Sequence, residues 1–179
     1  MARVLNVVGF QLAWWATVLA ASRGGAALGV LACAVFVIVQ AMASPHRVAD
    51  VRTVAAAVAM GLLFDGALVR SGWVTYAADS GVLPAPAWIL ALWAAFAITL
   101  NHALAALRPS MAAVLGAVGG PLSYLAAERL GAIALVAPRP ALVALALGWA
   151  LATGALVAIA RRARRLEHAE AAPLAGGVR

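Results

Sequence analysis

The chain has 179 residues, 66% of them hydrophobic, a net charge of +7 and a mean hydropathy of +1.01. Because soluble globular domains are only about 45–50% apolar, these values exclude one small water-soluble core and favour helices embedded in lipid. The apolar runs are long and do not alternate with polar residues, which disfavours an outer-membrane barrel.

The positive charge is concentrated near the end of the chain. Every basic residue is arginine, and four of the thirteen form one cluster, Arg161, Arg162, Arg164 and Arg165. No basic face with stacking aromatic residues lies outside this tail, so nucleic-acid binding is not expected. The single cysteine, Cys33, excludes an intrachain disulfide and a multi-cysteine metal site.

Six apolar runs predict six transmembrane helices. They are Val4–Ala21, Ala26–Ala43, Thr53–Val69, Trp88–Leu107, Met111–Val136 and Ala141–Ala160. The first run is longer than the apolar core of about 7–15 residues typical of signal peptides and contains Asn6 and Gln11. We therefore expect an uncleaved helix there, and an all-α, polytopic membrane bundle for residues 1–160.

Two connections are long enough to describe. Ser44–Arg52 is polar and is expected to be a loop at the membrane surface. Ser71–Ala87 holds two prolines and is expected to lie along the interface, with Trp73, Tyr76 and Trp88 as aromatic anchors.

The fifth run contains a helix-breaking sequence. Gly119-Gly120-Pro121 lies near its middle, so we expect a broken fifth helix there; a re-entrant segment is the alternative. Beyond the sixth run, residues 161–179 are expected to form a cytoplasmic tail that begins basic and ends disordered.

Six spans place both termini on one side of the membrane. That side then holds nine arginines and the other four, which predicts cytoplasmic termini. The arginine cluster Arg161, Arg162, Arg164 and Arg165 is expected to bind an anionic lipid surface.

Polar residues inside the apolar runs are the candidates for a site. Asn101 and His102 lie ~9–10 Å from the cytoplasmic surface by helical rise, at about the level of Gln11. A histidine there could relay protons, or its ring could simply be satisfied by a neighbouring helix.

A second layer is expected in the outer half of the membrane. Asp65 could pair with Arg70, Arg129 or the Tyr124 hydroxyl, and Glu128 lies one helical turn after Tyr124. Since a charged residue in a helix centre costs about 2.5–3.5 kcal/mol, Asp65 should face inward. It is either a proton or ligand site or a helix-fixing contact.

The sequence contains no catalytic or metal-binding motif. It has no paired carboxylates within one helical turn, no glycine-rich phosphate loop and no metalloprotease spacing. No catalytic residue, metal or cofactor is therefore assigned, and the protein partner is left open.

Four segments resemble the DUF2878 family of bacterial inner-membrane proteins of unknown function. They are N-x4-Q-x2-WW from Asn6 to Trp15, GLLFDGALVRSG at 61–72, PAWILALWAAFAITLNHAL at 86–104 and GAVGGPLSYLAAERLGA at 116–132. The resemblance implies a polytopic protein of the bacterial inner membrane, encoded by a gene that accompanies genes for lipid-modifying enzymes.

Three functions are compatible with the sequence. The first is a lipid-binding or accessory component of membrane-lipid metabolism or envelope maintenance, with membrane lipids as partners. The second is a small proton-coupled carrier that uses Asp65 or His102. The third is a membrane-embedded lipid-modifying enzyme, which requires two polar groups to converge on one reacting atom.

Overall fold

The fold is an all-α bundle with one very small sheet. The computed structural model describes residues 2–78, 81–104 and 106–175, with the side chains of 170–175 left undescribed. Among these residues the elements are α1 (Ala2–Ser22), α2 (Ala26–Ala43), α3 (Arg47–Arg70), β1 (Val74–Tyr76), α4 (Ala87–His102), α5 (Pro109–Arg129), β2 (Ile133–Leu135) and α6 (Pro138–Ala175).

Five of the helices are long and apolar enough to cross a membrane, and only α4 is shorter, at 16 residues. Helices are the expected solution for an apolar chain in lipid, because each backbone N–H and C=O group is satisfied within the helix itself. Many large apolar side chains point outward, for example Leu63, which is 70% exposed. The chain is therefore a multi-pass membrane protein.

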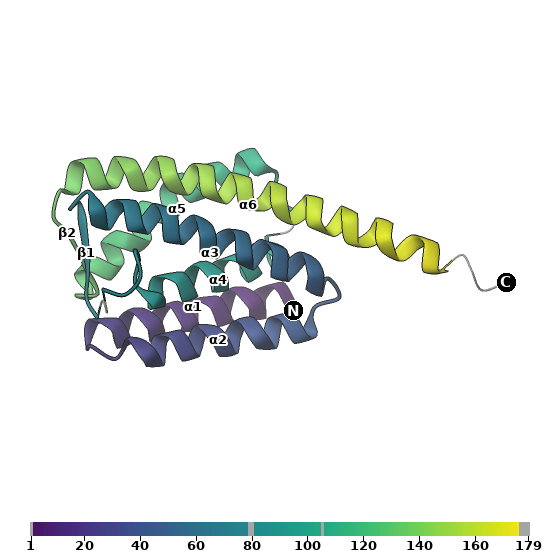
Figure 1. Ribbon diagram of the computed structural model, residues 1–179, viewed down its shortest axis with the longest axis horizontal. Helices are drawn as coiled ribbons and strands as arrows, with labels where there is room; N and C mark the ends of the chain where they lie inside the picture. The colour runs from purple at the N-terminus through teal and green to yellow at the C-terminus, as the bar shows by residue number, and fades with distance from the viewer. Residues whose placement is uncertain (1, 79–80, 105, 176–179) are drawn as a thin grey trace.

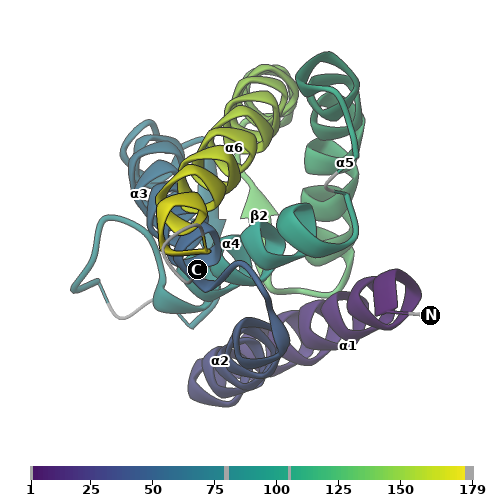
Figure 2. The same ribbon diagram turned by 90° about the vertical axis from the view of Figure 1, so that its right-hand side faces the viewer.

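Helix α4 occupies the centre of the bundle. It contacts α1, α2, α3 and α6, and nine of its residues are buried. Helix α5 packs chiefly against α6, and in Figure 2 the ribbons of α1 and α5 stand apart on either side of α4. A short helix suffices here because α4 is surrounded by protein rather than lipid.

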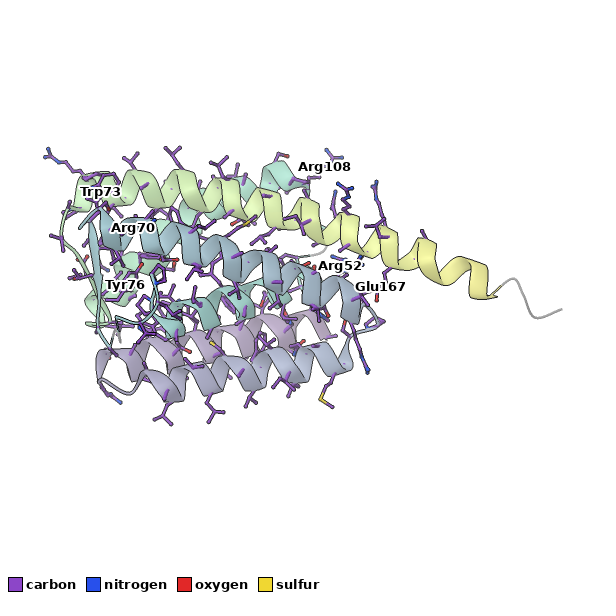
Figure 3. The ribbon with its side chains drawn as sticks, in the orientation of Figure 1. Arg52, Arg70, Trp73, Tyr76, Arg108 and Glu167 are labelled. Atoms are coloured by element: carbon purple, nitrogen blue, oxygen red, sulfur yellow. The ribbon has the colours of Figure 1, made fainter. Side chains whose placement is uncertain are left out.

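The bundle has two distinct ends. Figure 1 shows both chain termini at one end, which we call the terminal end, and the two strands at the other, the sheet end. Arg52, Arg108 and Glu167 lie toward the terminal end, whereas Arg70, Trp73 and Tyr76 lie at the sheet end (Figure 3). Both termini on one side is the arrangement that the six predicted spans require.

The small sheet was not predicted. Strands β1 and β2 pair antiparallel, with Val74 opposite Leu135 and Tyr76 opposite Ile133. All four of these side chains are buried. The prediction that the fifth run continues to Val136 is therefore wrong, since α5 ends at Arg129 and the chain turns through Gly131, whose φ is +78°.

Two of the three expected interface anchors are inside the protein. Trp88 is 1% exposed and donates through Nε1 to the carbonyl of Ala77 at 3.1 Å. Tyr76 is 9% exposed and stands edge-on to the Trp88 ring. The aromatic residues of this connection thus hold the sheet end against α4, because their polar atoms find protein partners there.

The expected break in the fifth helix is not observed. Helix α5 continues from Pro109 to Arg129 with Pro121 inside it. A proline removes one backbone donor, and a helix in a membrane protein tolerates this when its neighbours and side chains compensate. Gly116 and Gly120 lie directly against α6 here, so this stretch serves close helix packing.

Other boundaries also differ from the sequence prediction. Helix α3 begins at Arg47 rather than Thr53, so most of the expected surface loop is helical, and α4 ends at His102 rather than Leu107. Helix α6 runs through the arginine cluster to Ala175, so residue 160 does not mark a structural boundary. The last four residues, 176–179, lie outside the described part of the chain.

Packing explains why the tail stays helical. Glu167 accepts hydrogen bonds from the backbone N–H groups of Val48 and Ala49, each at 3.4 Å. These N–H groups belong to the first turn of α3, which has no partners for them within its own helix. Glu167 therefore caps α3, and residues 161–167 belong to the folded bundle.

Candidate functional site

A buried carboxylate joins four elements of the bundle. Asp65 of α3 is fully buried and accepts hydrogen bonds from Tyr76 Oη at 2.6 Å, from Trp93 Nε1 at 2.7 Å and from Tyr124 Oη. These donors come from β1, α4 and α5, respectively. We call this group of four residues the Asp65 cluster.

The cluster satisfies Asp65 without a cation. An ionised carboxylate only accepts hydrogen bonds, and a Trp indole only donates, so the Trp93 contact has one possible direction. Burial raises the pKa of the Tyr76 phenol well above its usual value, so Tyr76 stays a neutral donor. The three donors can stabilise Asp65 as a charged carboxylate. If the Asp65 carboxyl is protonated, a phenol oxygen can accept its hydrogen bond.

The expected partners of Asp65 are only partly those observed. The Tyr124 hydroxyl, one of the three, makes the contact, whereas Arg70 and Arg129 are exposed. Glu128 lies elsewhere, since its Oε1 accepts from the Leu135 backbone at 2.9 Å and so fixes β2 to α5. Tyr76 and Trp93 were not anticipated as partners, and Tyr76 was instead expected to be an aromatic anchor at the interface.

Asn101 and His102 meet a carboxylate that sequence reasoning missed. Asn101 Nδ2 donates to Asp50 Oδ1 at 2.7 Å, and His102 Nε2 lies 3.0 Å from Asp50 Oδ2. Asp50 is 1% exposed. The sequence prediction placed Asp50 in a surface loop. An Asp in the first turn of a helix interacts favourably with the helix dipole, and this preference is the signal that could have placed Asp50 in α3.

Gln11 does not join this pair. It is exposed and lies one helical turn or more from Asn6, which is the buried polar residue of α1 and donates to Gln40 Oε1 at 2.9 Å. The expected layer of Gln11, Asn101 and His102 is therefore wrong. Asn101 lines a pocket together with Arg3, which lies eight residues before Gln11 on α1, so Gln11 and Asn101 differ in depth. Gln11 faces the space between α1 and α5.

A polar pocket of about 230 Å³ lies beside Asp50 at the terminal end. We call it the terminal pocket. It is lined by Arg3, Ser44, Pro45, His46, Asp50, Asn101, His102 and Arg164. It thus gathers side chains from α1, from the start of α3, from the end of α4 and from α6.

A larger and mostly apolar groove of about 440 Å³ lies between α1 and α5, with α4 and α6 forming its floor. Its aromatic lining residues are Phe10, Trp14, Trp15, Trp88, Trp93, Phe96, Tyr124 and Trp149. Trp15, Leu115 and Leu122 among the lining residues are 46–59% exposed, so the groove opens on the side of the bundle. The separation of the α1 and α5 ribbons in Figure 2 agrees with this position.

Glycines make room for the aromatic floor of the groove. The Trp93 and Trp149 rings stack with centroids 4.4 Å apart and planes 13° from parallel. A Cβ atom at Gly61 would collide with Trp93, and one at Gly120 would collide with Trp149. The tryptophans inside the runs are therefore both packing residues and walls of the groove.

The Asp65 cluster contributes to the lining of the groove, whereas Asp50, Asn101 and His102 do not. Tyr124 and Trp93 line the groove and also donate to Asp65. Asp65 and Asp50 are fifteen residues apart on α3, roughly 22 Å by helical rise. Among the described residues, no group of three His, Cys, Asp or Glu side chains could hold a metal ion.

Comparison with known proteins finds a match to one family model. A family model described as a protein of unknown function, DUF2878, matches residues 3–155. No curated protein and no solved structure matches the chain.

Proposed function

We propose that this chain, which belongs to the DUF2878 family of proteins of unknown function, binds a membrane lipid in the groove between α1 and α5. In this proposal the protein is a binding or accessory component of membrane-lipid metabolism or envelope maintenance in a bacterial inner membrane. The main support for this proposal is an aromatic groove that opens on the lipid-facing side of the bundle.

The groove has the size and chemistry that a lipid chain requires. Its volume falls within the roughly 300–1,000 Å³ typical of ligand sites, and such sites are mostly apolar with a few polar groups. Exposed Trp15, Leu115 and Leu122 are among its lining residues, so a lipid could enter from the membrane without crossing water.

A buried hydroxyl without a partner lies beside the groove. Thr153 lines the groove and is 3% exposed, yet its Oγ1 has no hydrogen-bond partner among the described residues. The buried Thr17, Thr53 and Thr99 each donate to the carbonyl four residues earlier, at 2.7–3.1 Å. The Thr153 hydroxyl lies against Gly116 at the α5–α6 contact beside the groove, so a small shift of the two helices would expose it to a bound molecule.

The topology in this proposal places the terminal end in the cytoplasm. Arg52 and Arg108 lie at that end together with the arginine cluster of α6 (Figure 3). Arg162 and Arg165 of the cluster are exposed. Positive residues favour the cytoplasmic side, and each exposed arginine near an anionic leaflet contributes ~1 kcal/mol of attraction.

A blocking substitution tests the groove. A Cβ at Gly119 meets nothing within 4 Å, and Gly119 lines the groove, so Gly119→Phe should fill the groove without a backbone clash. Val118→Phe is the matched control, because Val118 is the exposed neighbour that does not line the groove. Each variant is purified in mild detergent, and the co-purifying lipid is quantified by mass spectrometry.

We expect Gly119→Phe to lose most of the co-purifying lipid and Val118→Phe to retain the wild-type amount. Equal retention by both variants would remove the proposal. A second reading is the lipid composition of cells that express each variant at the same level, where only Gly119→Phe should resemble cells without the protein.

A lipid-modifying enzyme is the second candidate, and one contact favours it. Tyr124 lines the groove while its hydroxyl contacts Asp65, which is the pairing that general acid–base chemistry needs. Tyr124→Phe would then abolish a change in lipid composition but leave lipid binding intact. A proton-coupled carrier that uses Asp65 or His102 remains the third candidate, and no specific contact favours it over the other two. The two residues belong to separate groups, since His102 contacts Asp50.

A further inference from the structure

The terminal pocket holds an arginine without an acceptor. Arg164 Nε is buried and has no hydrogen-bond partner among the described residues. Both oxygens of Asp50 already have partners in Asn101 and His102. Within the described residues the ion pairs are His46–Glu167 and His102–Asp50, so no arginine is paired with a carboxylate.

The same pocket also holds an acceptor without a donor. Asn101 is 6% exposed, and while its Nδ2 donates to Asp50, its Oδ1 has no partner among the described residues. Arg3 of α1 brings a second guanidinium to the pocket. A matching occupant therefore has anionic oxygens for the two arginines and a neighbouring hydroxyl or ammonium group for Asn101.

Charge in the pocket favours an anion. Arg3 and Arg164 supply two positive charges against the one negative charge of Asp50. His102 lies against Asp50 and His46 lies 3.8 Å from Glu167, so both histidines are next to carboxylates. Guanidinium groups bind phosphate oxygens through paired N–H donors, which makes phosphate the best-matched anion.

The position of the pocket connects it to the groove. Arg3 lines the pocket, and Phe10 and Trp14 line the groove. Separations of seven and eleven residues place the three side chains on one face of α1. Arg3 and Phe10 are only about 10 Å apart along the helix axis, which is within the length of one phospholipid.

We propose that the terminal pocket binds the phosphate of a glycerophospholipid headgroup through Arg3 and Arg164, with Asn101 accepting from the adjacent hydroxyl or ammonium group. The acyl chain of the same lipid lies in the groove, so this inference rests on the proposed function and names its ligand class. The pocket lies at the helix ends, which is the depth at which lipid headgroups reside.

The test compares two arginines of one cluster. Arg164→Gln removes the buried guanidinium, and Arg162→Gln removes the same charge from an exposed position on the same helix. Each purified protein is exchanged into mixed micelles with phosphatidylglycerol, with diacylglycerol, which lacks the phosphate, or with inorganic phosphate alone. Bound ligand is counted by native mass spectrometry.

We expect phosphatidylglycerol to bind wild type and Arg162→Gln equally, and to bind Arg164→Gln about tenfold more weakly, the effect of losing one charge-assisted hydrogen bond. Arg3→Gln should weaken binding in the same direction, and it is a second variant at an exposed position should Arg164→Gln fold poorly. Arg164→Lys should restore part of the affinity, since it keeps the charge but not the paired donors.

Three outcomes contradict the inference. One is equal binding of phosphatidylglycerol by wild type, Arg164→Gln and Arg3→Gln. Another is equal binding of diacylglycerol and phosphatidylglycerol by the wild type. The third is saturation by inorganic phosphate alone with no further gain from the lipid, which would make the site one for soluble phosphate. Gly119→Phe reports separately on the groove, so loss of lipid there with no effect of Arg164→Gln would remove only the headgroup assignment.

Discussion

The indole N–H of Trp93 donates to Asp65 Oδ2 at 2.7 Å, inside a bundle whose outer surface is apolar. The same indole ring stacks on Trp149 and forms part of the groove floor. One side chain therefore links a buried carboxylate to the wall of the candidate lipid site. Changes at Asp65 should consequently affect both the stability of the bundle and the shape of the groove.

Asp65→Ala should strongly destabilise the protein. It leaves the donors of Tyr76, Trp93 and Tyr124 without their acceptor, and each unsatisfied buried group costs about 1–3 kcal/mol. Tyr124→Phe removes a single donor and leaves two, so its effect should be smaller. Thermal unfolding in detergent, followed by tryptophan fluorescence, measures both. Equal melting temperatures for the two variants would show that the cluster does not hold the helices together.

Gly61→Ala and Gly119→Ala should act in opposite directions. A methyl group at Gly61 would collide with the Trp93 ring, and such overpacking costs about 1–3 kcal/mol. Gly119 has open space around it, so alanine there should stabilise α5 by roughly 0.5–1 kcal/mol through helix propensity. The same thermal measurement compares them, and a Gly61→Ala protein as stable as wild type would contradict the packing of Trp93.

Asp50→Ala should destabilise the terminal end more than Glu167→Ala. Asp50 is 1% exposed and satisfies both Asn101 and His102, so its loss leaves two polar side chains unpaired at a cost of about 1–3 kcal/mol each. Glu167 is less buried and its contacts are longer, at 3.4 Å. Thermal unfolding in detergent compares the two variants, and a lower melting temperature for Glu167→Ala than for Asp50→Ala would reverse the ranking.

Single cysteines should report the orientation of the bundle. Cys33 is 1% exposed, so it should give little background with a membrane-impermeant maleimide. Ser110→Cys, at the start of α5, and Arg139→Cys, at the start of α6, introduce exposed thiols at opposite ends of the bundle. Arg139→Cys should be labelled in intact spheroplasts, and Ser110→Cys only after the membrane is opened. The reverse pattern would place the termini outside.

The sequence predicted the number of helices because run length and hydropathy are strong local signals. It also anticipated the contact of Asp65 with Tyr124, since a costly buried carboxylate needs a nearby donor. The two strands escaped prediction because three residues carry too little periodicity. Pro121 was expected to break α5, yet the helix is continuous, because packing against α6 overrides the local preference.

Neighbours across the bundle were the hardest to foresee. Gln11 and Asn101 were expected at one depth, but α4 ends at His102, so Asn101 lies at the terminal end beside Arg3. A single sequence gives neither the end of a helix nor its rotation. Asp50 was overlooked because Arg47 and Arg52 lower the hydropathy around it, which made a helical turn look like a loop. The terminal pocket follows from that one missed residue and from the extension of α6.

Glu167 accepts a hydrogen bond from the N–H group of Val48, which lies 119 residues earlier in the chain. During synthesis α3 is therefore made long before the side chain that caps it exists. The hydrogen bonds from the Val48 and Ala49 N–H groups to Glu167 can form only after α6 has been synthesised. Closure of the terminal end, including the pocket that Arg164 lines, is consequently a late event in assembly, and a chain truncated at Ala160 would keep all six apolar runs yet never complete it.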